Sequence, residues 1–198
     1  MHIRPGTTGR AFVLAWTAAL AAPILAQAQP ASAPPANPFT RHATSLEFGT
    51  AVMQEAWNYN EAHEWLFEGS GSMWWAFKEG FAVGLEWQHV RVFQVTPDAW
   101  VQGFSPLIRW RYVERPKWNA YLEVGPGISW SDRPAPPRGT LFNYLFQSET
   151  GVMRRLSAGT HAVVALRFLH LSNNGREGVH RNPDIEALGL RAGVAIWF

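Results

Sequence analysis

The chain has 198 residues, which is enough for one domain, and its formal net charge is +2 at pH 7. This small net charge excludes a typical nucleic-acid binder. The absence of cysteine excludes a disulfide framework, a thiolate metal site and a cysteine nucleophile. The sequence contains 11 Trp and 12 Phe, an excess typical of membrane proteins, whose aromatic rings lie at the level of the lipid head groups.

Residues 1–28 have the pattern of a secretory signal peptide. A positively charged start precedes an apolar stretch (residues 11–25), and the small residues Ala26 and Ala28 follow it. We expect cleavage after Ala28, because the apolar stretch is too short for a transmembrane helix. Residues 29–43 are rich in Pro and Ala and are expected to form an N-terminal spacer. The protein is therefore expected to be exported.

Apolar and polar residues alternate in eight segments of the remaining chain. In residues 118–130 the even positions are mostly large and apolar, such as Leu122 and Ile128, whereas odd positions such as Glu123 and Ser129 are polar or small. Successive side chains of a strand point to opposite faces, so each segment has one apolar and one polar face. The expected strands are residues 44–54, 65–77, 81–93, 100–112, 118–130, 141–153, 160–172 and 185–198.

The connections between these strands alternate between short turns and longer or polar loops, a pattern typical of outer-membrane barrels. The chain also ends with the aromatic pair Trp197-Phe198. We therefore expect residues 44–198 to form an all-β fold, an eight-stranded antiparallel transmembrane β-barrel of the outer-membrane type. The short turns and both termini are expected on the periplasmic side.

A soluble β-sandwich or a lipocalin-like barrel would also show this alternation, but it would bury its apolar face. The two folds place the charged strand residues differently: on the surface of a soluble fold, and in the interior of an outer-membrane barrel. The aromatic residues that cluster near the strand ends favour the outer-membrane barrel. The charged residues concerned are Glu47, Glu86, Arg109, Arg111, Glu123, Arg167 and Arg191.

The last two expected strands carry polar residues on the face that should meet lipid. His170 and Ser172 share this face with Phe168, and Glu186 lies on the corresponding face of the next strand. A serine, a histidine and a carboxylate are the parts of a nucleophilic triad, and polar groups facing lipid are costly unless they have a function. Residues wetted by lipid head groups would show the same pattern, so both interpretations stay open on this evidence.

The same region resembles the active-site hairpin of the lipid A 3-O-deacylase (PagL) family of outer-membrane enzymes. Members carry a His-x-Ser-Asn-x-Gly motif and then an Asn-x-Gly-Ile-Glu-like stretch, which appear here as residues 170–175 and 182–186. Asp184 stands where the family favours Gly. The resemblance implies an eight-stranded barrel that hydrolyses the ester at the 3-position of lipid A in the outer leaflet.

The resemblance also implies the roles of individual residues. Ser172 would be the nucleophile, His170 the general base and Glu186 its orienting partner. The backbone N–H of Gly175 and the side chain of Asn182 would form the oxyanion hole, which stabilises the developing negative charge.

Asn173, His180 and Arg181 are expected to contact the substrate, the two cationic side chains through lipid phosphates. The implied partners are lipid A, as part of lipopolysaccharide, and the lipids of the outer membrane, with a homodimer left open. We expect no cofactor and no metal, and the other histidines lack the spacing of a metal site.

Two other functions compete with this interpretation. The outer-membrane phospholipase family uses a similar His-x-Ser-Asn-Gly motif, but its barrels have more strands, and here one expected strand follows Ser172. A non-catalytic structural or adhesion barrel, with the three residues together by chance, is the second alternative.

Overall fold

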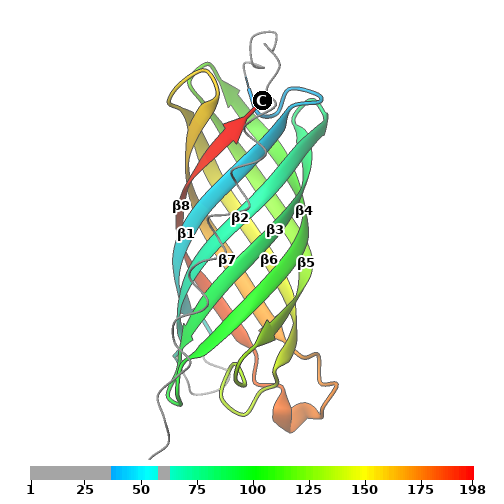
Figure 1. Cartoon of the computed structure of the whole chain (residues 1–198), viewed down its shortest axis with the longest axis vertical. Helices are drawn as coiled ribbons and strands as arrows, with labels where there is room; N and C mark the ends of the chain where they lie inside the picture. The colour runs from blue at the N-terminus through cyan, green and yellow to red at the C-terminus, as the bar shows by residue number, and fades with distance from the viewer. Residues whose placement is uncertain (1–36, 58–62) are drawn as a thin grey trace, which may run out of the picture. The chain divides into compact units, whose positions relative to one another are not determined.

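The computed structural model describes residues 37–57 and 63–198, which form eight antiparallel strands closed into one barrel (Figure 1). Each strand pairs with its neighbours in the chain, and β1 closes the barrel by pairing with β8. The strands are β1 (Thr44–Glu55), β2 (Trp65–Lys78), β3 (Phe81–Phe93), β4 (Ala99–Arg115), β5 (Trp118–Ser131), β6 (Phe142–Arg155), β7 (Thr160–Ser172) and β8 (Ile185–Trp197). The expected fold is confirmed, whereas the expected signal peptide lies outside the described residues.

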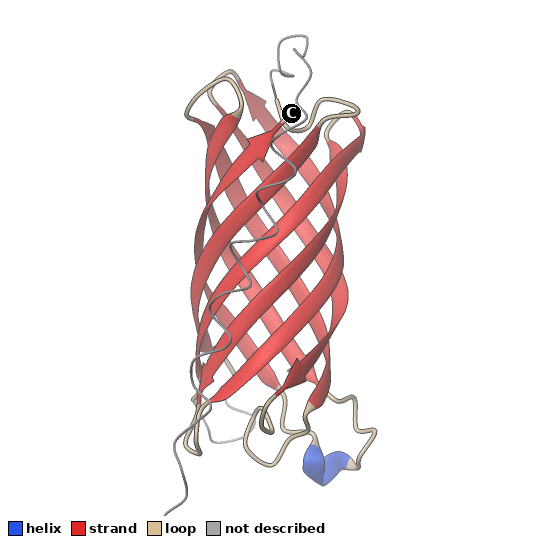
Figure 2. Ribbon diagram, in the orientation of Figure 1, coloured by secondary structure: helices blue, strands red, loops and turns tan. Residues whose placement is uncertain are grey.

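The two ends of the barrel differ in the length of their connections. At one end, which we call the turn end, short turns join β2 to β3, β4 to β5 and β6 to β7, and the C-terminus lies there (Figure 1). At the opposite end, the loop end, longer connections include the segment between β7 and β8. This segment contains a short 3-10 helix, η2 (Val179–Arg181), which Figure 2 shows in blue.

The outer surface of the barrel is apolar and rich in aromatic rings. Because side chains alternate along each strand, the large residues of one parity all face outward. Ring-to-ring contacts link outward residues of neighbouring strands, as between Phe81 and Trp110, and between Trp130 and Phe142. No helix within residues 37–57 and 63–198 is long and apolar enough to span a membrane.

The barrel interior contains charged side chains that pair with one another. Arg109 lies 2.9 Å from Glu47 and 2.6 Å from Glu123, and Arg191 lies 2.6 Å from Glu47. All four side chains are buried. The charged strand residues therefore lie inside, as expected for an outer-membrane barrel, and the soluble alternatives are excluded.

A second group of charges in the same interior is linked to the first by Arg191, which lies 3.5 Å from Glu149. Arg167 contacts three carboxylates, those of Glu68 at 3.2 Å, Glu149 at 3.2 Å and Glu86. An unpaired charge in this setting would be costly, so each guanidinium compensates several carboxylates and fixes the strands around it.

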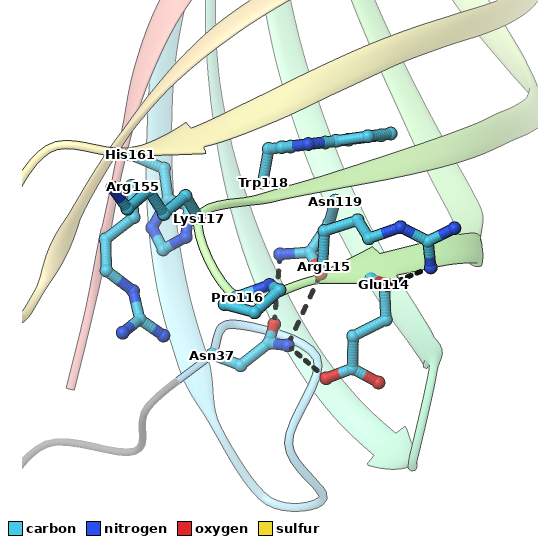
Figure 3. A pocket seen from close by; sticks show the side chains of 9 residues that line it. All are labelled: Asn37, Glu114, Arg115, Pro116, Lys117, Trp118, Asn119, Arg155 and His161. Atoms are coloured by element: carbon cyan, nitrogen blue, oxygen red, sulfur yellow. Dashed lines mark hydrogen bonds between the residues drawn. The ribbon is translucent and has the colours of Figure 1, made fainter.

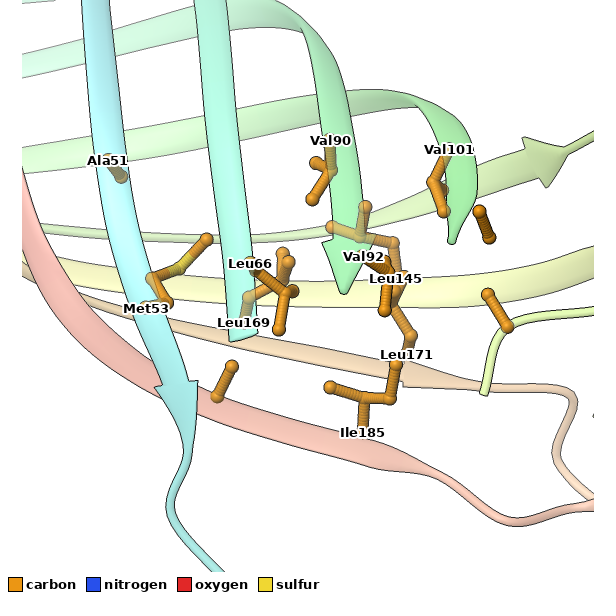
Figure 4. Close-up of a cluster of buried hydrophobic side chains, with 13 residues drawn as sticks. Ala51, Met53, Leu66, Val90, Val92, Val101, Leu145, Leu169, Leu171 and Ile185 are labelled. Atoms are coloured by element: carbon orange, nitrogen blue, oxygen red, sulfur yellow. The ribbon is translucent and has the colours of Figure 1, made fainter. Parts of the chain in front are cut away.

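At the loop end, buried apolar side chains fill the barrel interior beneath the last hairpin. Leu169 and Leu171 from β7 and Ile185 from β8 pack with Met53 and Leu66, and Figure 4 shows these side chains pointing toward one another. This packing fixes the inward residues on either side of His170. Because side chains alternate along a strand, His170 must then point outward.

Part of the expected spacer packs against the barrel at the turn end. Phe39 is buried in a cluster with Tyr121, Met153, Val163 and Ala195, and the His42 backbone N–H donates to the Ala76 carbonyl at 2.7 Å. The described part of this segment therefore contributes to the core.

Candidate active site

The last hairpin brings the three expected triad residues to the loop end. His170 and Ser172 lie at the end of β7, two positions apart and on its outward face, and Glu186 is the second residue of β8. In the antiparallel pairing of these strands, His170 lies directly opposite Glu186. Directly paired residues have neighbouring side chains, so the strand register alone places the imidazole beside the carboxylate.

The contact between His170 and Glu186 is close but longer than a standard hydrogen bond. Nδ1 of His170 lies 3.5 Å from Oε1 of Glu186, and the two side chains are 29% and 25% exposed. Catalytic hydrogen bonds are often long in the absence of substrate and shorten when it binds. The arrangement can therefore hold the imidazole with Nδ1 toward the carboxylate.

The Ser172 hydroxyl is held by the loop that follows β7. Its Oγ donates to Oδ1 of Asn182 at 2.9 Å and accepts from the backbone N–H of Asn174 at 3.1 Å. The backbone N–H of Asn173 also donates to Oδ1 of Asn182, at 2.8 Å. Asn182, ten residues along the chain, thus fixes both the serine and the start of the loop.

The chain reverses direction immediately after Ser172 in a tight, left-handed bend. Asn174 and Gly175 have positive φ angles of 54° and 70°, a region that glycine and asparagine tolerate best. The buried Asn173 holds this bend, because its Oδ1 accepts from the Gly175 N–H at 2.8 Å. The Asn-Asn-Gly sequence of the motif is therefore explained by backbone geometry.

Asn173 also ties the bend to the rest of the loop end. Its Nδ2 donates to the Arg181 carbonyl and, at 3.2 Å, to Oγ1 of Thr140 in the loop before β6. Thr140 is buried and was not identified in the sequence, since no motif connects it with residues more than thirty positions away. These bonds indicate that Asn173 holds the loop, and its expected contact with substrate stays a prediction.

Both expected donors of the oxyanion hole are engaged in this structure. The Gly175 N–H donates to Asn173, and Asn182 presents its oxygen to Ser172. The amide nitrogen of Asn182 could take this role only if the side chain turned and gave up its bonds with the Ser172 hydroxyl and the Asn173 N–H. The oxyanion-hole assignment therefore stays a prediction that requires a local rearrangement.

The two expected cationic contacts lie on η2 and are exposed. Arg181 pairs with Glu177 at 2.5 Å, and its guanidinium also donates to the Gly139 carbonyl at 3.4 Å. A further cation, Arg176, was not identified in the sequence. Its guanidinium donates to the hydroxyl of Tyr144 at 3.2 Å, and Tyr144 lies directly opposite Ser172 on β6.

One group of side chains near the site has donor atoms suited to a metal ion. These atoms of His170, Asp184 and Glu186 all lie within 4.8 Å of one another. An ion bound there would occupy the carboxylate and the imidazole that a triad needs, so the expectation of a metal-free reaction stays a prediction.

The closed sheet, the apolar outer surface and the charged interior define the class of this protein, an outer-membrane β-barrel. Two solved structures share the fold. Neisserial surface protein A (NspA) is 12% identical with a TM-score of 0.63, covering 79% of this chain and 99% of that one. The N-terminal barrel of Pseudomonas aeruginosa OprF is 10% identical with a TM-score of 0.53, covering 80% and 98%. No curated protein sequence matches the chain.

The sequence model of the lipid A 3-O-deacylase (PagL) family matches residues 42–195. This match spans nearly the whole barrel, and the chain therefore belongs to that family. The protein is a lipid A deacylase, an ester hydrolase of the outer membrane, and the resemblance drawn from the last hairpin is confirmed.

Proposed function

We propose that Ser172, His170 and Glu186 form the catalytic triad with which the protein removes the 3-linked acyl chain of lipid A. The observation that carries this proposal is the register of the last hairpin. It sets His170 directly opposite Glu186, with Ser172 on the same outward face two residues along.

In the proposed reaction, Nε2 of His170 accepts the proton of the Ser172 hydroxyl while Oγ attacks the ester carbonyl. Glu186 keeps the imidazole oriented and stabilises its positive charge. The tetrahedral intermediate collapses when the bond between the carbonyl carbon and the sugar oxygen breaks, and His170 protonates that oxygen. Water then attacks the acyl-enzyme in the same way, releasing a 3-hydroxy fatty acid and restoring the serine.

The attack requires Ser172 to exchange its bond with Asn182 for one with His170. We propose that substrate binding drives this exchange, and that the Asn182 amide then also gives up its bond with the Asn173 N–H and turns its nitrogen toward the oxyanion. Donors aimed at the developing charge contribute a large part of catalysis in such sites. His180 and Arg181 are proposed to contact the phosphates of lipid A.

The site faces outward, so the substrate is proposed to arrive by lateral diffusion in the outer leaflet. Tyr144 and Phe146 on β6 lie directly opposite Ser172 and His170 and expose their rings on the same surface. Acyl chains would pack on this surface by apolar contact. We propose accordingly that the loop end lies at the cell surface and that the turn end, with the C-terminus, lies in the periplasm. The homodimer left open by the sequence is a separate question. Light scattering, which measures the mass of the solubilised protein, would test it.

Mass spectrometry of lipid A from cells that produce the protein tests the proposal. Wild type should remove one hydroxyacyl group, whereas Ser172→Ala should leave lipid A unchanged although it reaches the outer membrane as a folded barrel. The matched control is Ser157→Ala, a serine in the exposed turn before β7, which should act like wild type. Deacylation by Ser172→Ala at the wild-type level would contradict the proposal.

A further inference from the structure

A cavity of about 270 Å³ lies at the turn end, away from the proposed active site. It lies between the β4–β5 turn and the neighbouring ends of β6 and β7, where the Arg155 N–H donates to the Lys117 carbonyl at 2.9 Å. A water molecule takes up roughly 30 Å³ in the liquid, so the cavity has room for a phosphate group with part of a lipid head group. Figure 3 shows Asn37 closing its lower side.

Cationic side chains flank this cavity on opposite sides. Arg155 lies on one side with Lys117, and Arg115 extends on the other (Figure 3). Among the described residues, neither Arg115 nor Lys117 has a carboxylate within ion-pair distance. The carboxylate of Glu114, which also lines the cavity, is 3.1 Å from the guanidinium of Arg111. The charge available to a ligand is therefore positive.

The inner wall of the cavity carries a second indication of a ligand. His161 is 1% exposed, and its Nδ1 has no hydrogen-bond partner among the described residues. Its ring packs against Trp197 at 3.8 Å between centroids, which fixes its position. Buried polar atoms in proteins are nearly always hydrogen-bonded, so this ring nitrogen is a hydrogen-bonding group that a ligand in the cavity could engage.

The wider turn end is also rich in positive charge. Cations outside the cavity include Arg41, Lys78 and Arg154, and all three are exposed. The outward-facing ring of Trp118 lies beside the cavity and directly opposite Arg154 on β6. Tryptophan near a basic cluster is typical of the interface between a membrane and water.

We propose that this cavity binds a phosphate group, presented by the head group of an anionic phospholipid. The class of lipid follows from the orientation proposed above, which places the turn end in the phospholipid leaflet facing the periplasm. Basic pockets at membrane interfaces bind anionic head groups through this combination of charge and hydrogen bonding. His161 and the Asn119 amide line the interior, and the flexible cations close over the phosphate.

Native mass spectrometry of the purified full-length barrel in a zwitterionic detergent tests the proposal, with phosphatidylglycerol as the probe and phosphatidylcholine as the reference lipid. The pocket variant is Lys117→Gln/Arg155→Gln. The matched control, Arg41→Gln/Lys78→Gln, removes two charges from the same end outside the cavity. The pocket variant should bind phosphatidylglycerol about tenfold more weakly than wild type, and the control should bind it like wild type.

Equal weakening in both variants would overturn the proposal, because it would show general attraction by the turn end. Equal binding of the two lipids by wild type would overturn it as well. Inorganic phosphate, as a second probe, should displace the lipid from wild type. If phosphate binds to the cavity and phosphatidylglycerol does not, the anion site is supported and its lipid source is overturned. These measurements need no deacylation, so their outcome is separate from that of the proposed triad.

Discussion

His170 and Glu186 lie directly opposite each other on β7 and β8, with Nδ1 of the histidine 3.5 Å from Oε1 of the glutamate. A second carboxylate, that of Asp184, lies within 4.8 Å of the same group. We predict that Glu186→Gln lowers kcat by about 10²–10⁴-fold, because the imidazole loses its orienting charge. Asp184→Asn should keep most of the activity. The measurement is the rate of hydroxy fatty acid release from purified lipopolysaccharide, and a larger loss in Asp184→Asn would reassign the orienting carboxylate.

Asn173 joins three parts of the loop end, through Thr140, the Arg181 carbonyl and the Gly175 N–H. Asn173→Ala removes these three hydrogen bonds, each of which contributes about 0.5–1.5 kcal/mol to stability. We predict a lower kcat and faster cleavage of the loop by trypsin, which cuts after Arg176 and Arg181.

The hydroxyl of Thr140 supplies the control for this prediction. Thr140→Val should show the same effects in weaker form, whereas Thr140→Ser, which keeps the hydroxyl, should resemble wild type. Unchanged trypsin sensitivity in Asn173→Ala would show that the loop is held by other contacts.

Arg167 compensates the buried carboxylates of Glu68, Glu86 and Glu149. Arg167→Met would leave them without this partner, and we predict a loss of about 3–5 kcal/mol in the free energy of unfolding. Urea unfolding of the barrel in lipid vesicles measures this loss. The matched control is Arg154→Gln, an exposed cation at the turn end, which should change stability by about 0.5 kcal/mol or less. Equal effects of the two changes would contradict the role given to the interior charges.

Two glycines offer a paired test of how closely the strands pack. A Cβ at Gly189 would lie 2.0 Å from the Val52 carbonyl oxygen, which belongs to the backbone of β1, whereas a Cβ at Gly69 would meet nothing within 4 Å. We predict that Gly189→Ala destabilises the barrel by about 1–3 kcal/mol, because β1 and β8 must move apart. Gly69→Ala should be neutral or slightly stabilising. Both values come from urea unfolding, and equal stabilities would contradict the close approach of β1 and β8.

Much of the architecture was predictable because a two-residue alternation encodes both the strands and their faces. The outward direction of His170, Ser172 and Glu186 followed from parity alone, and the inward direction of Arg167 and Arg191 did too. The ends of the strands were predicted less well. The fourth strand was expected to end at residue 112, but β4 continues to Arg115, because pairing continues wherever a neighbouring strand offers hydrogen bonds.

Contacts made by loops could not be predicted from the sequence. The bond between Ser172 and Asn182 and the burial of Thr140 depend on how the connections before β6 and β8 fold back. The packing of Phe39 into the turn end depends in the same way on the finished barrel. These positions show no periodicity, because their partners are set by the tertiary structure.

Covalent labelling with a fluorophosphonate tests most directly whether Ser172 is an activated nucleophile, because this reagent reacts with serines that a neighbouring base has activated. Peptide mass spectrometry of the labelled barrel should find the adduct on Ser172 in wild type. His170→Ala should lose the adduct although it folds, and heat-denatured wild type should remain unlabelled. An adduct on another residue, or equal labelling of Ser172 in His170→Ala, would contradict the triad.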